Sequence, residues 1–185
     1  MRYLVAVLGI IAVVFLVIVI FFKGDNTKAP VQNAAKIMKL TDYADKNSMV
    51  SVTTIGTLVG EENRREIRVT VTPTERRLEV LSGYEEAVMS SQSFPNTQTA
   101  YANFLSALSD LGFTSSHKNT TDPRGVCPTG NRYIYDLSEG GDHLSNLWQV
   151  NCDIPGTFAG HGTTTRQLFQ QQIPGYDKLV QGVKL

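Results

Sequence analysis

Few residues of this chain have the types and spacing that chemistry at a site requires. The three histidines, His117, His143 and His161, lie in three different polar or glycine-rich stretches, and none has a second histidine at the spacing of a metal site. Asp142 with His143, or Cys152 with His161, could form a reactive pair only if the fold assembled it, and Cys152 only as a free thiol. We therefore expect solvent-exposed loop histidines, with no metal site and no cofactor.

Two further motifs resemble known sites but lack essential parts of them. Ser115 and Lys118 have the Ser-x-x-Lys spacing of penicillin-recognising enzymes, yet they lie in the polar stretch 114–124, and neither Ser-Asp-Asn nor Lys-Thr-Gly follows. The glycine-rich run 156–163 could direct backbone amides at an anion, but it lacks the lysine of a phosphate-binding loop. The sequence therefore predicts no catalytic residue and a protein that is not an enzyme.

The two cysteines are placed to form a disulfide. Cys127 precedes a predicted strand at 132–137, and Cys152 ends a second predicted strand at 146–152, so a hairpin would bring both to its open end. Closing a loop of about 25 residues contributes about 3–4 kcal/mol in the chain-entropy model. A disulfide indicates an oxidising, extracytoplasmic side. Two unrelated buried thiols in a cytoplasmic domain are the alternative.

The most apolar stretch of the chain lies at its start. Residues 3–22 carry no charge, and 16 of these 20 residues are Val, Ile, Leu or Phe. As a helix they would span about 30 Å, the thickness of the hydrocarbon core of a bilayer. The run is too long for a cleaved signal peptide, has no small-x-small site at its end, and is followed by no nearby lipid-acceptor cysteine. We expect residues 1–22 to be an uncleaved, single-pass transmembrane anchor.

Two features disagree about the orientation of this anchor. Lys23, Lys28, Lys36 and Lys39 follow the apolar run, and the positive-inside rule would place the following domain in the cytoplasm. The cysteine pair favours the opposite side. We give the cysteines the greater weight and expect a cell-membrane protein whose domain is extracytoplasmic.

Beyond the anchor, residues 23–33 read as a polar spacer, and residues 34–185 as one α+β domain. A helix is predicted at 33–45, followed by strands near 49–59, 65–72, 77–82 and 86–94. Apolar residues at helical spacing predict a long amphipathic helix at 97–111, and a short C-terminal helix is predicted at 163–172. With the hairpin, we expect an antiparallel sheet of five or six strands, packed by these two helices.

The balanced charge of the chain excludes a nucleic-acid partner. Lys plus Arg equals Asp plus Glu, 17 of each, so there is no net positive field. The only basic doublets, Arg64-Arg65 and Arg76-Arg77, stand beside glutamates near predicted strand ends. We interpret both doublets as solvated strand edges of mixed charge.

Several short strings along the domain have a familiar pattern. They are Gly83-Tyr84, SSQSF at 90–94, Asn96, Ala100-Tyr101, Phe104-Leu105, CPTG at 127–130, RYIY at 132–135, Leu147-Trp148, Cys152, GTF at 156–158 and Ile173-Pro174. Together they resemble uncharacterised, single-pass surface proteins of ultrasmall, host-attached bacteria. The resemblance implies a signal-anchored bacterial surface protein with a disulfide, and it adds no catalytic residue.

We therefore expect a non-enzymatic module at the cell envelope that binds another protein or an envelope component. The candidate surface consists of three loop segments at 114–124, 138–145 and 156–165. Two alternatives remain open. A pilin-like filament subunit would share the apolar helix, sheet and disulfide, although the apolar run lacks an acidic residue and no leader cut site precedes it. A small envelope hydrolase would depend on the histidines.

Overall fold

The computed structural model describes residues 39–119 and 122–185 of the chain. The predicted anchor (1–22), the spacer (23–33) and the first part of the predicted helix at 33–45, up to residue 38, lie outside the described residues. Within the described ranges, no helix is both long enough and apolar enough to cross a bilayer. All described residues belong to one compact unit, residues 37–185.

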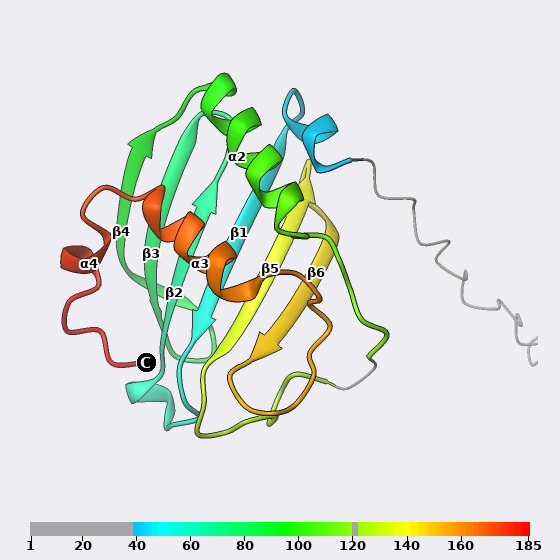
Figure 1. Cartoon of the computed structure of the whole chain (residues 1–185). Helices are drawn as coiled ribbons and strands as arrows, with labels where there is room; N and C mark the ends of the chain where they lie inside the picture. Colours follow the sequence, from blue (N-terminus) through cyan, green and yellow to red (C-terminus); the bar gives the residue numbers. More distant parts are fainter. Residues whose placement is uncertain (1–38, 120–121) are drawn as a thin grey trace, which may run out of the picture. The chain divides into compact units, whose positions relative to one another are not determined.

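Six antiparallel strands form one sheet in the order β4-β3-β2-β1-β5-β6 (Figure 1). The first four strands form a meander, after which the chain crosses one face of the sheet and places β5 beside β1. The structure thus confirms the α+β class. The strands are β1 (Ser48–Ile55), β2 (Arg65–Val71), β3 (Glu75–Ser82), β4 (Ala87–Pro95), β5 (Arg132–Glu139) and β6 (Asp142–Val150).

Helices α2 and α3 lie on the same face of the sheet (Figure 1). The predicted amphipathic helix is confirmed as α2, which begins after Thr97, whose hydroxyl accepts a hydrogen bond from the Ala100 amide at 3.2 Å. The predicted C-terminal helix is confirmed as α3. The helical elements are η1 (Leu40–Tyr43), η2 (Glu61–Asn63), α2 (Gln98–Asp110), α3 (Gly162–Gln171) and α4 (Tyr176–Leu179).

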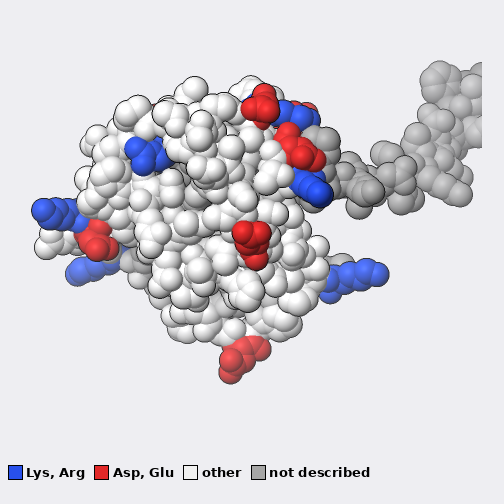
Figure 2. Space-filling model, turned by 45° about the horizontal axis from the view of Figure 1, so that its top comes forward, with Lys and Arg blue, Asp and Glu red and all other residues white. Residues whose placement is uncertain are grey.

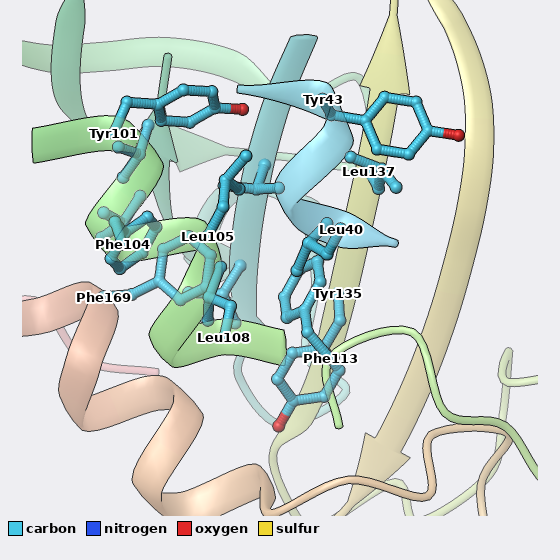
Figure 3. Close-up of a cluster of buried hydrophobic side chains, with 14 of the residues drawn as sticks. Leu40, Tyr43, Tyr101, Phe104, Leu105, Leu108, Phe113, Tyr135, Leu137 and Phe169 are labelled. Atoms are coloured by element: carbon cyan, nitrogen blue, oxygen red, sulfur yellow. The ribbon is translucent and has the colours of Figure 1, made fainter. Parts of the chain in front are cut away.

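The main core fills the space between these helices and the sheet (Figure 3). The alternation predicted for β2 is confirmed, because Ile67, Val69 and Val71 all point into this core. Phe104 of α2 meets Phe169 of α3 edge to face, with ring centroids 5.0 Å apart, and this contact joins the two helices. The main core therefore forms on the helix-facing side of the sheet.

Three predicted boundaries are wrong. β1 ends at Ile55, short of the predicted 59, and the following Gly56 leaves room for the backbone of Leu185, from which an added Cβ would lie 2.3 Å. The predicted loop 138–145 is instead the end of the β5–β6 hairpin, which turns at Gly140 and Gly141 alone. In the described part of the segment predicted as a helix at 33–45, only the 3-10 turn η1 forms, and its apolar residues Leu40 and Tyr43 are buried in the domain.

The helix side of the molecule carries few charges. In Figure 2, blue and red side chains are scattered over a mostly uncharged surface, and neither sign forms a patch. Most charged residues of the strands, such as Glu66, Arg68 and Glu79, alternate with the core residues and lie on the opposite face, whereas Arg65 and Arg76 share the face of the core residues near strand ends.

Candidate functional site

The face of the sheet opposite α2 and α3, here called the open face, carries mostly polar and charged side chains at its centre, with Met49, Ile55 and Ile134 among them. The strand register arranges its side chains in cross-strand rows. In the described chain, no helix packs on this face. From β3 to β6 the rows are Leu81, Glu66, Ile55, Arg132 and Val150; Glu79, Arg68, Thr53, Ile134 and Trp148; Arg77, Thr70, Ser51, Asp136 and Asn146; and, from β1 to β6, Met49, Ser138 and His143.

The open face is hollow at its centre. Ser51, Thr53 and Thr70 have short side chains, and longer side chains such as Arg77 and His143 surround them. The result is a depression of about 540 Å³. The short residues are buried although no described helix or strand covers them, because the surrounding side chains shield them from solvent.

A buried ion pair lies at one end of this hollow. Arg64, just before β2, donates from Nη2 to Oε1 of Glu66, and the two residues are only 8% and 1% exposed. The Arg64 guanidinium also stacks on the ring of Tyr84, 4.4 Å from its centroid. The second carboxylate oxygen of Glu66, Oε2, is buried without a hydrogen-bond partner. An unpartnered buried acceptor is costly unless a ligand or water satisfies it.

The electrostatic state of Glu66 follows from this environment. Burial raises the pKa of Glu66 above its usual value, while the neighbouring Arg64 guanidinium opposes that rise. Glu86 raises the pKa further, since a second carboxylate disfavours ionisation. Glu66 is thus a carboxyl group that gains from a hydrogen-bond donor or a positive charge brought to its free oxygen.

A second polar group lies across the hollow on β5 and β6. His143 Nδ1 lies 2.7 Å from Oδ1 of Asp136, and the Asn146 side chain donates to the same oxygen at 2.9 Å. Asp136 is 6% exposed, whereas the His143 side chain is 68% exposed. A buried carboxylate therefore orients an accessible imidazole.

Acidic side chains outnumber basic ones in the lining of the hollow. Four carboxylates face two arginines there, and Arg68 is already engaged by Glu86 and by Thr53, whose hydroxyl it contacts from Nε at 3.2 Å. The four carboxylates are Glu66, Glu79, Glu86 and Asp136. A ligand with donors or positive charge fits this balance better than an anion.

The disulfide closes one corner of the open face. Cys127 and Cys152 are bonded, with their Cα atoms 6.1 Å apart. Cys127 packs with Trp148 and Val150, which are open-face residues of β6. Gly130 is required beside the bond, because an added Cβ would lie 2.4 Å from the Cys127 sulfur. The predicted sulfur pairing is present, and it holds the loop before β5 against the sheet.

One of the three histidines predicted to lie in loops, His143, lies on a strand instead. It pairs with Asp136 rather than with the adjacent Asp142. His117 and His161 make backbone hydrogen bonds: the His117 amide donates to the carbonyl oxygen of Thr157, and the His161 amide donates to the carbonyl oxygen of Leu111. Among the described residues, no three His, Cys, Asp or Glu side chains are arranged to hold a metal.

Two of the predicted loop segments lie together beside β6. The Ala159 amide donates to Ser115 O at 2.9 Å, and Ser116 bridges to Phe158. Ser115 follows α2 instead of opening a helix, so it is not placed as an acylating serine would be. The segment 138–145 is the far end of the β5–β6 hairpin, where Gly140 bonds to Asn47.

Sequence reasoning missed the open face itself. Interpreting Arg64 as a solvated edge residue was wrong, since it is buried against Glu66. The available signal was the alternation of β2, which puts Glu66, Arg68 and Thr70 on one side. Alternation marks that side as polar, but it does not show that Glu66 is buried.

No known protein family matches the chain, and no curated protein matches it.

Proposed function

We propose that this chain is a membrane-tethered, extracytoplasmic module that binds a protein or an envelope component on the open face without catalysing a reaction. The single observation that carries the proposal is the free oxygen of Glu66, a buried acceptor beside a polar hollow. A binding site that awaits a donor has this property.

The proposed ligand presents hydrogen-bond donors, and a positive charge on the ligand would strengthen its binding. Glu66 Oε2 would accept one donor, and Asp136 lies in the same hollow beyond Thr53 and Ser51. The hydroxyls of the central rows can both donate and accept, so they suit an amine- or hydroxyl-bearing group. An ammonium-bearing side chain of a protein or an amine of an envelope polymer would provide this chemistry.

The tether and the side of the membrane rest on the sequence. The apolar run 3–22 supports a single-pass anchor, and the Cys127–Cys152 bond supports an oxidising compartment. A rigid sheet whose loop is held by a disulfide suits a surface exposed outside the cell.

The test captures the ligand with the full chain in its own membrane. After chemical crosslinking, Ser51→Arg should lose the captured component, because a long side chain at this central position occupies the hollow. Gln167→Arg, on the exposed side of α3, should retain it, and Trp148 fluorescence would verify that both variants fold. Equal capture by both variants, or no specific component with either, would refute the proposal.

The Asp136–His143 pair supports one second candidate, an envelope hydrolase. A carboxylate orients a catalytic histidine in the same way. Within the described chain, however, no Ser, Thr or Cys side chain hydrogen-bonds to His143. Mass analysis of the captured component distinguishes the two: an unchanged mass after incubation supports binding, and a cleaved product that disappears with His143→Ala supports hydrolysis.

A further inference from the structure

Strand β4 forms an edge of the sheet, and among the described strands it pairs with β3 alone. Residues 87–93 are all exposed, and Val88 and Met89 are 58% and 56% exposed. An edge strand offers a row of unpaired amides and carbonyls to another strand. β4 is nine residues long, which is enough to pair with one.

The opposite edge, β6, is covered at Trp148 by the loop at 156–158. The Trp148 amide donates to the Thr157 hydroxyl at 2.9 Å, and the Phe158 amide donates to Trp148 O at 2.9 Å. Gly156 permits this approach, because an added Cβ would lie 2.1 Å from Trp148 O. The fold thus protects the Trp148 part of one edge, whereas β4 at the other edge is exposed along residues 87–93.

The register identifies the free backbone groups of β4. The Asn96 amide donates to the carbonyl oxygen of Thr74, and the next residue pair is Glu75 opposite Pro95. In an antiparallel ladder, hydrogen-bonded and non-hydrogen-bonded pairs alternate. Phe94 and Gln92 are therefore the residues whose backbone groups bond to β3. The amide and carbonyl groups of Ser91 and Ser93 then point away from β3. No described residue bonds to these outward groups.

The composition of β4 lacks the usual protection of an edge strand. Its sequence, AVMSSQSFP, contains no charged residue. Edge strands commonly carry lysine, an early proline or a bulge along their length. Here the register shift lies beside Val88 and Met89, and the proline is the last residue, so residues 90–94 form a regular and uncharged pairing segment.

We propose that β4 pairs antiparallel with β4 of a second copy of this chain, about a two-fold axis at Gln92. Ser91 of each copy then exchanges both backbone hydrogen bonds with Ser93 of the other, which satisfies all the free groups of these two residues. An uncharged strand is suited to itself, because no like charges are placed opposite each other. This isologous contact closes as a dimer.

The dimer extends the sheet continuously through both copies. The open faces lie on the same side of that extended sheet, since Ser91 and Ser93 belong to the rows that contain Glu79 and Arg77. Two copies of the hollow would thus face one ligand surface together. This inference goes beyond the proposed function and does not depend on the ligand.

Cysteine crosslinking in the full chain, in membranes of the expressing cell, tests the register. Gln92→Cys places two thiols across the axis at a Cα separation of about 4.5 Å, within the range of a disulfide. Ser90→Cys is the matched control on the same face of the strand, and its two thiols would be about 14 Å apart along the strands. With copper phenanthroline as the oxidant, we expect at least tenfold more disulfide dimer from Gln92→Cys.

Charge variants of the Gln92→Cys chain test the pairing of Ser91 with Ser93. S91K/S93K places like charges opposite each other, and we expect at least a tenfold loss of the crosslinked dimer. S91K/S93E changes the same positions but places opposite charges together, so the dimer should stay within about twofold of its original level. Both serines are exposed, so the monomer tolerates either change.

Three results would overturn the inference. Equal crosslinking of Gln92→Cys and Ser90→Cys would show collision of tethered chains without register. Equal loss with both charge variants would show that Ser91 does not face Ser93. Crosslinking of Gln92→Cys to a different protein alone would assign the edge to a foreign strand.

Discussion

Removing one partner of the buried Arg64–Glu66 pair should lower the free energy of unfolding much more than replacing both partners with apolar residues. In the domain of residues 37–185, Arg64→Met leaves the Glu66 carboxyl buried, and Glu66→Leu leaves the Arg64 charge buried. Each single change should lower the free energy of unfolding by about 3–5 kcal/mol, the usual cost of an uncompensated buried charge. The double variant, with two apolar side chains of similar size, should lie within about 1–2 kcal/mol of the parent.

The pH dependence should separate the two single variants. Without Arg64, the pKa of Glu66 should rise further, because the guanidinium opposes the effect of burial. A carboxyl group with a raised pKa in the folded state stabilises that state below its ordinary pKa and loses this contribution as pH rises. Arg64→Met should therefore be more stable at pH 5 than at pH 8 relative to the parent, whereas Glu66→Leu lacks this dependence.

Urea unfolding followed by tryptophan fluorescence measures these quantities. Trp148 is the only tryptophan and is 4% exposed, so its emission reports unfolding. The control cycle uses Lys46→Met and Glu139→Leu, a half-exposed pair with an interaction of about 0–1 kcal/mol. A coupling energy for Arg64 and Glu66 no larger than this control, or equal pH profiles for both single variants, would refute the reasoning.

Three further predictions concern the disulfide, the covered edge and the core. Replacing Cys127 and Cys152 by serine should lower the free energy of unfolding by about 3.5 kcal/mol in the chain-entropy model, and reduction of the parent should reproduce this in urea titrations. Gly156→Ala should move the covering loop away from β6, so hydrogen exchange at the Trp148 amide should accelerate, while exchange at the Val69 amide in β2 should change little. Burial raises the pKa of Tyr101 to about 12, so absorbance titration should show it ionising after exposed tyrosines, and stability should fall between pH 10 and 12. Burial also raises the pKa of Tyr135 and Tyr176, so Tyr101→Phe should show a smaller fall than the parent, and an equal fall would contradict the assignment to Tyr101.

The parts of the fold that depend on local periodicity could be predicted from the sequence. The spacing of Tyr101, Phe104, Leu105 and Leu108 predicted α2, and the alternation of Ile67, Val69 and Val71 predicted β2 and its core face. These patterns have the periods of a helix and a strand, so a single segment carries the information.

The site depends on contacts between distant segments and could not be predicted in the same way. Glu66 is buried between Ile55 and Leu81, which belong to the two neighbouring strands. Asp136 meets His143 because the hairpin extends beyond its predicted ends. Sequence spacing suggested Asp142 as the partner of His143. Adjacent strand residues point to opposite faces, however, so His143 instead contacts Asp136 on the neighbouring strand.

The crossover that places β5 beside β1 has a consequence for the order of folding. Ser48 pairs with Glu139 and Ile55 with Arg132, so the centre of the sheet joins segments separated by most of the domain. Such pairings form slowly, because the chain must close a long loop before any contact stabilises it. The β1–β4 meander and the β5–β6 hairpin, by contrast, each contain only local pairings. Cys127 and Cys152 flank that hairpin, so their bond can form before the two halves meet, and the domain would then assemble from a meander and an already crosslinked hairpin.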